Sequence, residues 1–143
     1  MMIPLGTAHT DDSVVLYFPD ERAVFSADVM QIKRLPQSLA PSIGSYIDAM
    51  RTITSLDFDH ALTGHAVSGT KKDALMTLQY FEDLATGVAA GIGAGRSLQE
   101  IQKTLTLDNY KDFERWDTHR TVHIAYVYES LKGKPAPGAT RTN

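Results

Sequence analysis

The sequence of 143 residues predicts an α/β protein in which one small, mostly antiparallel sheet is covered by helices. Two short runs of β-branched and aromatic residues, at 13–18 and 23–26, are typical of strands. Apolar residues then recur at three- and four-residue spacing over residues 42–55 and again after residue 70, which is typical of helices with one buried face. This length suits a single domain, which we expect to span residues 1–132.

The composition limits the classes of function. The chain has 14 Lys and Arg against 17 Asp and Glu, a net charge of −3, and therefore lacks the basic surface of a nucleic-acid-binding protein. It has no cysteine, so a disulfide, a thiolate metal site and a cysteine nucleophile are excluded. No apolar run reaches the roughly 18 residues of a membrane span, and the first residues do not resemble a signal peptide. We expect a soluble, cytoplasmic protein with no nucleic-acid or membrane partner.

The first two strands are expected to form a hairpin. The run at 13–18 ends at Pro19 and Asp20, which favour a turn because proline fixes its φ and aspartate hydrogen-bonds to its own backbone. The run at 23–26 follows directly, so the two strands should pair antiparallel. Residues 29–41 contain two prolines and are expected to be an irregular loop that supplies substrate contacts, although no residue in it indicates a chemistry.

The middle of the chain predicts two helices and a third strand. The helix at 42–55 is followed by a short strand at 58–63. Thr70 and Asp73 have the spacing of a capping box at the start of the longest helix. The glycines between residues 87 and 95 are expected to weaken the end of that helix, because glycine is a poor helix former.

Two more helices are expected in the C-terminal part. Ser97 and Glu100 predict the start of a short helix by the same capping logic, and residues 118–132 form an amphipathic pattern. Residues 133–143 are rich in proline and glycine and are expected to form a disordered tail. Helices of this kind cover one face of a three-stranded sheet, and the other face, if apolar, needs a partner.

Three polar side chains stand at the predicted ends of strands. His9 precedes the first strand, Asp28 follows the second and His65 follows the third. Strand ends hold side chains in fixed positions while the adjoining loops stay open to substrate. Two imidazoles and one carboxylate suit Zn²⁺, Fe²⁺ or Mn²⁺. Because the three residues are far apart in sequence, the pattern alone leaves open both a metal site and ordinary polar loops.

The other histidines and two aspartates have simpler interpretations. His60 lies inside the third predicted strand, and we expect a partly buried strand residue rather than a ligand. His119 and His123 are four residues apart on the last helix, but without a His-Glu-x-x-His pattern we expect a solvated pair. Asp57 and Asp59 are expected on a solvated strand face.

Three segments together resemble motifs of the metallo-β-lactamase superfamily. The segment GTAHTDDSVVLYFP at residues 6–19 resembles the third histidine motif of that superfamily. VFSAD at 24–28 resembles the strand that delivers its metal-bridging aspartate, and LTGH at 62–65 resembles its final Pro-Gly-His motif. The similarity extends from about residue 5 to residue 132. It implies one half of an αββα sandwich, in which two such halves stack sheet on sheet.

The resemblance also implies a metal centre and a reaction. It assigns His9 to one metal, Asp28 to a bridging position and His65 to a second metal, with zinc, iron or manganese as the ion. The implied reaction is hydrolysis of an ester, amide or thioester bond by metal-activated water. Ala27 and Ala66 stand where the superfamily usually has glycine, and both differences are expected to affect how the backbone approaches the metal.

The main signature of the superfamily, His-x-His-x-Asp-His, is absent, because it belongs to a first half that this sequence lacks. Three ligands spread over two metal positions do not complete a dinuclear centre. The bare inner sheet face predicts a homodimer. Three interpretations therefore remain open: a hydrolase completed by dimerisation or by a partner, a non-catalytic homodimeric structural or interaction module, and a fragment of a longer gene product. The substrate and the catalytic residues are not assigned.

Overall fold

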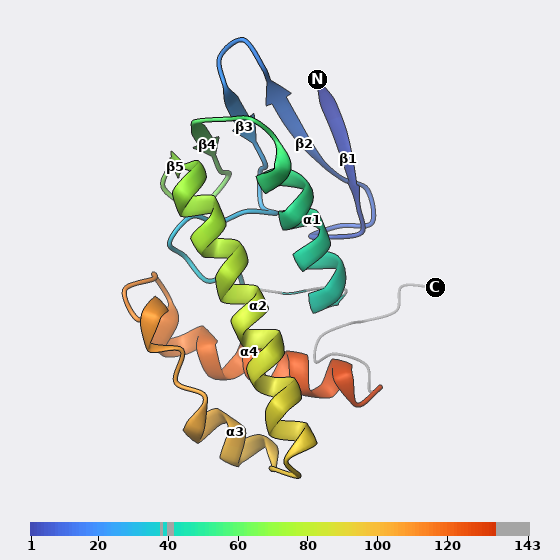
Figure 1. Cartoon of the computed structure of the whole chain (residues 1–143), viewed down its shortest axis with the longest axis vertical. Helices are drawn as coiled ribbons and strands as arrows, with labels where there is room; N and C mark the ends of the chain where they lie inside the picture. Colours follow the sequence, from blue (N-terminus) through green and yellow to red (C-terminus); the bar gives the residue numbers. More distant parts are fainter. Residues whose placement is uncertain (38, 40–41, 134–143) are drawn as a thin grey trace.

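A computed structural model of the chain describes residues 1–37, 39 and 42–133, so all of the predicted tail except Gly133 lies outside the described residues. Within these ranges no helix combines the length and the hydrophobicity that a membrane span requires. The elements follow one another along the chain in this order (Figure 1): β1 (Met2–Gly6), β2 (Ser13–Phe18), β3 (Ala23–Phe25), α1 (Ile43–Ser55), β4 (His60–Leu62), β5 (Gly69–Thr70), α2 (Lys71–Gly93), α3 (Leu98–Thr104), the 3₁₀ helix η1 (Asp108–Tyr110) and α4 (Trp116–Leu131).

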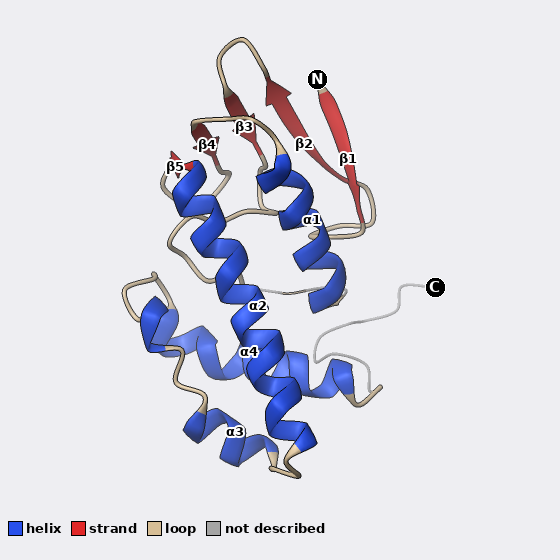
Figure 2. Cartoon of the chain, in the orientation of Figure 1, coloured by secondary structure: helices blue, strands red, loops and turns tan. Residues whose placement is uncertain are grey.

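The strands form one mixed sheet in the order β1-β2-β3-β4-β5. Three of the four pairings are antiparallel, including the predicted β2–β3 hairpin, and β3 pairs with β4 in parallel. Helices α1 and α2 lie across one face of this sheet, and α3 and α4 lie beyond its end (Figure 2). The predicted fold class, a small, mostly antiparallel sheet covered by helices, is confirmed.

The sheet has two more strands than the sequence predicts. β1 contains Pro4, which lacks a backbone N–H and is tolerated because β1 is an edge strand. Its register with β2 shifts between Pro4 and Gly6. β5 has only two residues, Gly69 and Thr70, and pairs with β4. Neither segment has the alternating pattern by which a strand is detected in sequence.

The inner face of the sheet and the two long helices build the core. Val15, Val24 and Ala61 are fully buried on three neighbouring strands. They belong to one apolar cluster with Met50 of α1 and Phe81 of α2. Because the helices cover this face alone, the side chains that alternate with these residues point away from the helices.

Both predicted capping boxes are present. The side chain of Thr70 accepts a hydrogen bond from the backbone of Asp73 while the Asp73 carboxylate accepts one from the Thr70 backbone, and Ser97 and Glu100 pair in the same way. Each reciprocal pair satisfies backbone groups that a helix start would otherwise leave without a partner. The starts of α2 and α3 are therefore fixed by local sequence.

Helix α2 continues through Gly93 instead of weakening at its glycines. A Cβ atom at Gly87 would lie 2.5 Å from a methyl carbon of Leu105, and one at Gly91 would lie 2.6 Å from Cγ1 of Ile101. The glycines are thus needed for the close approach of the α3 segment. Packing of α3 compensates for the poor helix propensity of glycine. The predicted weakening of the helix end was based on that propensity alone.

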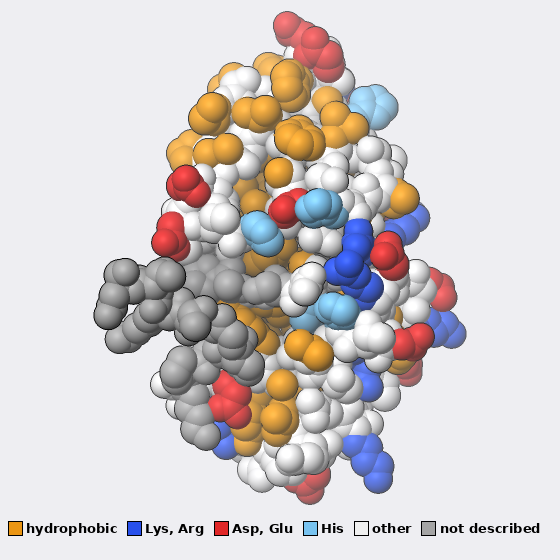
Figure 3. Space-filling view, turned by 180° about the vertical axis from the view of Figure 1, so that it is seen from behind, with side chains coloured by type: hydrophobic (Ala, Val, Ile, Leu, Met, Phe, Trp, Pro, Cys, Tyr) orange, Lys and Arg blue, Asp and Glu red, His pale blue; other side chains and the backbone are white. Residues whose placement is uncertain are grey.

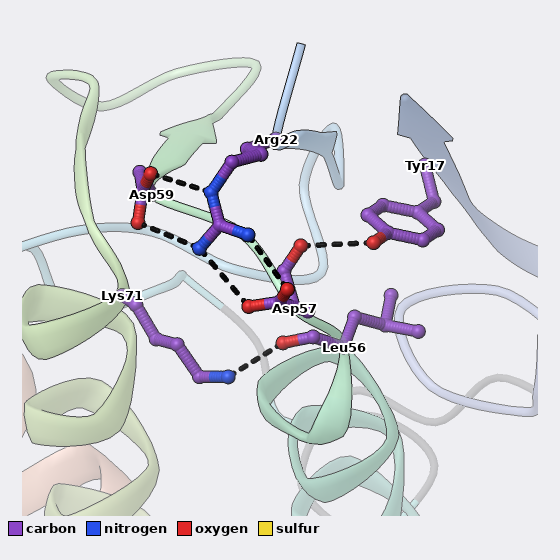
Figure 4. Close-up of polar contacts among 6 residues, drawn as sticks. All are labelled: Tyr17, Arg22, Leu56, Asp57, Asp59 and Lys71. Carbon is purple, nitrogen blue, oxygen red and sulfur yellow. Dashed lines mark hydrogen bonds and ion pairs between the residues drawn. The ribbon is translucent and has the colours of Figure 1, made fainter. Parts of the chain in front are cut away.

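A cluster of hydrogen bonds ties the β2–β3 turn to the segment before β4 (Figure 4). Arg22 Nη1 and Nε lie 2.6 and 2.7 Å from carboxylate oxygens of Asp57 and Asp59, respectively. These hydrogen bonds hold the pKa of both carboxyl groups below the usual range. The Tyr17 hydroxyl donates to the backbone oxygen of Asp57 at 2.8 Å. Asp57 and Asp59 are solvent-exposed, as predicted, but they also act as a clamp on Arg22.

Two histidines differ from their predicted environments. His60 is exposed on β4, not partly buried. His123 is buried, so the predicted solvated pair with His119 is wrong. Its Nε2 donates to the backbone oxygen of Pro36 and its Nδ1 accepts from the Tyr80 hydroxyl, both at 2.8 Å. Helical spacing did not reveal this burial, because it depends on contacts with α2 and with the loop after β3.

Candidate metal centre

The three predicted ligands lie close together at one end of the sheet. His9 belongs to the β1–β2 loop, Asp28 follows β3 and His65 follows β4. The Nε2 atom of His65 lies 3.3 Å from Oδ1 of Asp28, and the Nε2 atom of His9 lies 3.7 Å from Oδ2. Histidine side chains gather beside an acidic one on the face seen in Figure 3. The fold thus brings together residues from three loops.

Asp28 is positioned by the parallel pairing of β3 with β4. The pairing continues beyond the strands, because the backbone N–H of Ser26 donates to the oxygen of Leu62 at 3.1 Å and that of Gly64 to the oxygen of Ala27 at 2.8 Å. Between these bonds the chain turns at Ala27, which has a left-handed φ of +46°. The backbone at Ala27 is strained, since L-residues adopt this region at a cost.

Gly64 is required for the close contact between the two loops. A Cβ atom at this position would lie 2.6 Å from Oδ1 of Asp28 and 3.2 Å from the carbonyl carbon of Ala27. Any other residue would have to displace the carboxylate or the loop. Ala66 carries no such strain, because its φ is not positive. The effect of either alanine on the approach of the backbone to a metal stays a prediction.

The loop that carries His65 is held by hydrogen bonds on both sides. The Thr63 hydroxyl donates to the backbone oxygen of Ala66 at 2.8 Å and accepts from its N–H at 3.1 Å. From the other side, Arg34 donates to the backbone oxygen of His65 and forms an ion pair with Glu114 at 3.4 Å. The His65 side chain itself is 66% exposed. Its backbone is thus fixed while its imidazole remains accessible.

The donor set fits part of a metal centre. Two ligands at about 2.0–2.2 Å from one tetrahedral zinc ion lie about 3.3–3.6 Å apart. The distance between His65 and Asp28 is within this range and that between His9 and Asp28 is slightly longer. Each histidine faces a different oxygen of the carboxylate, an arrangement that suits a carboxylate shared between two metal positions.

The same residues do not complete either position. Among residues 1–37, 39 and 42–133, no group of three or more His, Cys, Asp and Glu side chains is arranged to hold a metal ion. The pairs formed by Asp28 with His9 and with His65 provide two ligands for each position. Stable zinc sites have three or four protein ligands, so neither pair alone makes a stable zinc site.

A pocket of about 490 Å³ opens beside the three residues. Four of its lining residues were not identified from the sequence, three of them in the loop that was expected to supply substrate contacts. Isolated glutamines and arginines in an irregular loop carry no pattern, which explains why they were missed. The pocket is lined by His9, Asp28, Gln31, Arg34, Gln37, His65 and Arg115.

Comparisons with known proteins found similarity among solved structures alone. Neither protein-family models nor curated proteins match the chain. Among solved structures it is similar to the metallo-beta-lactamase from Pontibacter korlensis, with 21% sequence identity and a TM-score of 0.49. The similarity covers 57% of this chain and 40% of that protein. The matched region is thus less than half of that protein's length.

Proposed function

We propose that the chain binds a divalent metal ion, zinc in the first instance, through His9, Asp28 and His65. The observation that carries this proposal is the position of Asp28, whose two carboxylate oxygens face the two histidines at 3.7 and 3.3 Å. The proposed activity is hydrolysis of an ester, amide or thioester bond. A bound zinc ion would act as a Lewis acid and make water at this site more acidic.

The residues of this chain have separate roles in the proposal. Asp28 is 30% exposed and orients both imidazoles through its carboxylate. His65 is the more exposed of the two histidines and lies where a substrate would first meet the site. Arg34 is a positioning residue, because it holds the backbone of His65 and not its ring.

A second copy of the chain is the proposed source of the missing ligands. Apolar side chains gather over the outward side of the sheet (Figure 3), and they come from β1, β2, β3 and β4. Leu16 is paired with Met2 on one side and with Phe25 on the other, and Phe25 is paired with Leu62. We call these outward-pointing residues the apolar sheet face: Met2, Pro4, Val14, Leu16, Phe18, Phe25 and Leu62.

The chemistry of the apolar sheet face favours self-association. None of its seven residues is charged, so two copies can meet there without repulsion around a two-fold axis. Phe18 is 41% and Leu62 40% exposed, and burying such surface is favourable by about 25 cal/mol per Å². The proposed ligands lie at the end of the same strands, so a partner on this face would approach the metal centre.

Zinc titration of matched histidine variants tests the metal proposal. We expect the wild-type protein to bind zinc, and His65→Ala to weaken binding by at least about tenfold, as loss of a metal-supporting group typically does. His60→Ala is the control, because His60 is also exposed but begins β4 and pairs with Ala23, at the other end of these strands from Asp28 and His65. Equal zinc affinity in all three proteins, with unchanged circular dichroism, would rule the site out.

A non-catalytic homodimeric module is the second candidate function. It is favoured by the lack of a three-ligand group in the described part of the chain together with the apolar sheet face. On this interpretation the fold serves association alone. A dimer that binds no zinc, and whose melting temperature is unchanged by a chelator, would support it over the hydrolase.

A further inference from the structure

The pocket beside the candidate metal centre has a basic side. Arg34 and Arg115 both line it together with His9, Asp28 and His65. They come from different parts of the chain, Arg34 from the loop after β3 and Arg115 from the residue that caps α4. The backbones of these two segments are joined, since Leu35 N–H donates to the oxygen of Glu114 at 3.0 Å. The pairing brings the two arginines to the same pocket.

The two arginines differ in the contacts that their side chains make with the rest of the protein. Arg34 is 17% exposed, holds the His65 backbone and pairs with Glu114. The Arg115 side chain makes no hydrogen bond or ion pair with any side chain in the described ranges, although Arg115 is partly buried. Arg115 also has a left-handed φ of +68°. A partly buried arginine without a fold partner is available for a ligand.

The charge around the pocket is positive on this side. Asp28 is the one acidic residue that lines it, against two arginines. His119, near the arginines on α4, has its pKa lowered by burial and by the charges of Arg115 and Arg34. The positive field of the two side chains is thus felt by a neighbouring group, and it would attract an anion.

A buried amide adds a further polar group. Gln31 also lines the pocket, is 6% exposed, and its Oε1 has no hydrogen-bond partner in the described structure. Such an unpartnered oxygen is unusual, because buried polar groups are usually hydrogen-bonded. That oxygen accepts hydrogen bonds and so suits a donor group of a bound molecule, whereas the two arginines supply the donors that an oxyanion needs.

We infer that this pocket binds a small molecule through an oxyanion group, a carboxylate or a phosphate, with Arg115 as the main anchor and Arg34 as the second. The guanidinium group matches both oxyanions in geometry and makes charge-assisted hydrogen bonds to them. A volume of about 490 Å³ suits a small-molecule ligand. The inference deepens the proposed function. It rests on that function in one respect, namely that the bound molecule is a substrate.

Anion titration of metal-free protein tests the inference separately from zinc binding. Inorganic phosphate and, in a second series, acetate are added at pH 8, and ¹H–¹⁵N NMR shifts are followed. Arg115→Gln is compared with Arg96→Gln, a variant with the same charge change at an exposed arginine outside the pocket. We expect the dissociation constant to rise at least about tenfold in Arg115→Gln and to stay unchanged in Arg96→Gln. Tighter binding of phosphate or of acetate identifies which oxyanion the pocket prefers.

The outcomes separate the two proposals. Zinc binding is measured on the same variants, and Arg115→Gln should bind zinc like the wild type. Anion binding at Arg115 without zinc binding would preserve the anion pocket and refute the metal centre. Absence of binding for both anions, or an equal loss in the two arginine variants, would overturn the anion pocket whatever the zinc result.

Discussion

Ala27 carries backbone strain next to the proposed ligand Asp28. Its φ of +46° lies in the left-handed region, where a Cβ atom is unfavourable and glycine is not. We expect Ala27→Gly to raise the free energy of unfolding by about 1 kcal/mol in urea denaturation. Ala66→Gly is the control, because its φ is not positive, and it should lower stability by about 0.4–1 kcal/mol through the unfolded state. Changes of the same sign in both variants would contradict the strain.

Gly64 makes a second prediction at the scale of a single residue. A methyl group there would lie 2.6 Å from Oδ1 of Asp28, so Gly64→Ala should displace the carboxylate and weaken zinc binding by at least about tenfold, as loss of a group that orients a metal ligand typically does. Gly93→Ala adds a methyl group where no atom lies within 4 Å and should leave zinc binding unchanged. Calorimetric titration of both variants measures the difference, and unaltered affinity in Gly64→Ala would show that the contact does not hold the site.

Several elements meet at His123, where a histidine is buried. We therefore predict that the free energy of unfolding depends on pH. Burial lowers the pKa of His123 to about 4, from about 6.5 in the unfolded chain. Between these values the unfolded state binds a proton that the folded state does not, so the free energy of unfolding should fall as the pH drops from 6.5 to 4. The full effect is about 3 kcal/mol.

Urea unfolding at several pH values measures this dependence. His123→Gln keeps a polar side chain for Tyr80 and Pro36 but does not titrate, so the slope between pH 4 and 6.5 should be smaller. His119→Gln is the matched control on the same helix. The pKa of His119 is also lowered. His119 is only partly buried, however, whereas His123 is buried. An equal slope in the wild type and in His123→Gln would contradict the assignment.

The elements also show which features local sequence determines. Capping boxes at Thr70 and Ser97 were predicted because all their interactions lie within four residues. β1 and β5 were missed because pairing with distant strands creates them. For the same reason the burial of His123 and the exposure of His60 were assigned wrongly. Tertiary contacts decide these features, and single-sequence patterns do not contain them.

The candidate site also contains residues that the sequence predicts and residues that it does not predict. His9, Asp28 and His65 could be selected because each stands at a predicted strand end and within a motif. Arg34 and Arg115 could not, since only the pairing of residues around Leu35 and Glu114 brings them to one pocket. The proposed ligands were therefore predictable in identity, whereas the residues that would bind the substrate were not.

At the scale of the whole molecule, the apolar sheet face makes a prediction about assembly. Phe25 lies at its centre and is 36% exposed. We expect Phe25→Lys to weaken self-association by at least about tenfold, because two buried charges would face each other across a two-fold axis. Val122→Lys introduces the same charge at a 52% exposed valine on α4 and should have no effect. Sedimentation equilibrium measures both, and a monomeric wild type would contradict the dimer.

The most direct test of the central claim is native mass spectrometry of the protein purified without chelator and supplied with zinc. One spectrum reports the mass of the assembly and the number of bound ions. A dimer that carries zinc, and loses it in Asp28→Ala but not in Asp12→Ala, is the predicted result; Asp12 is an exposed aspartate in the same loop as His9. A dimer without zinc, or equal zinc in both variants, would contradict the metal centre at His9, Asp28 and His65.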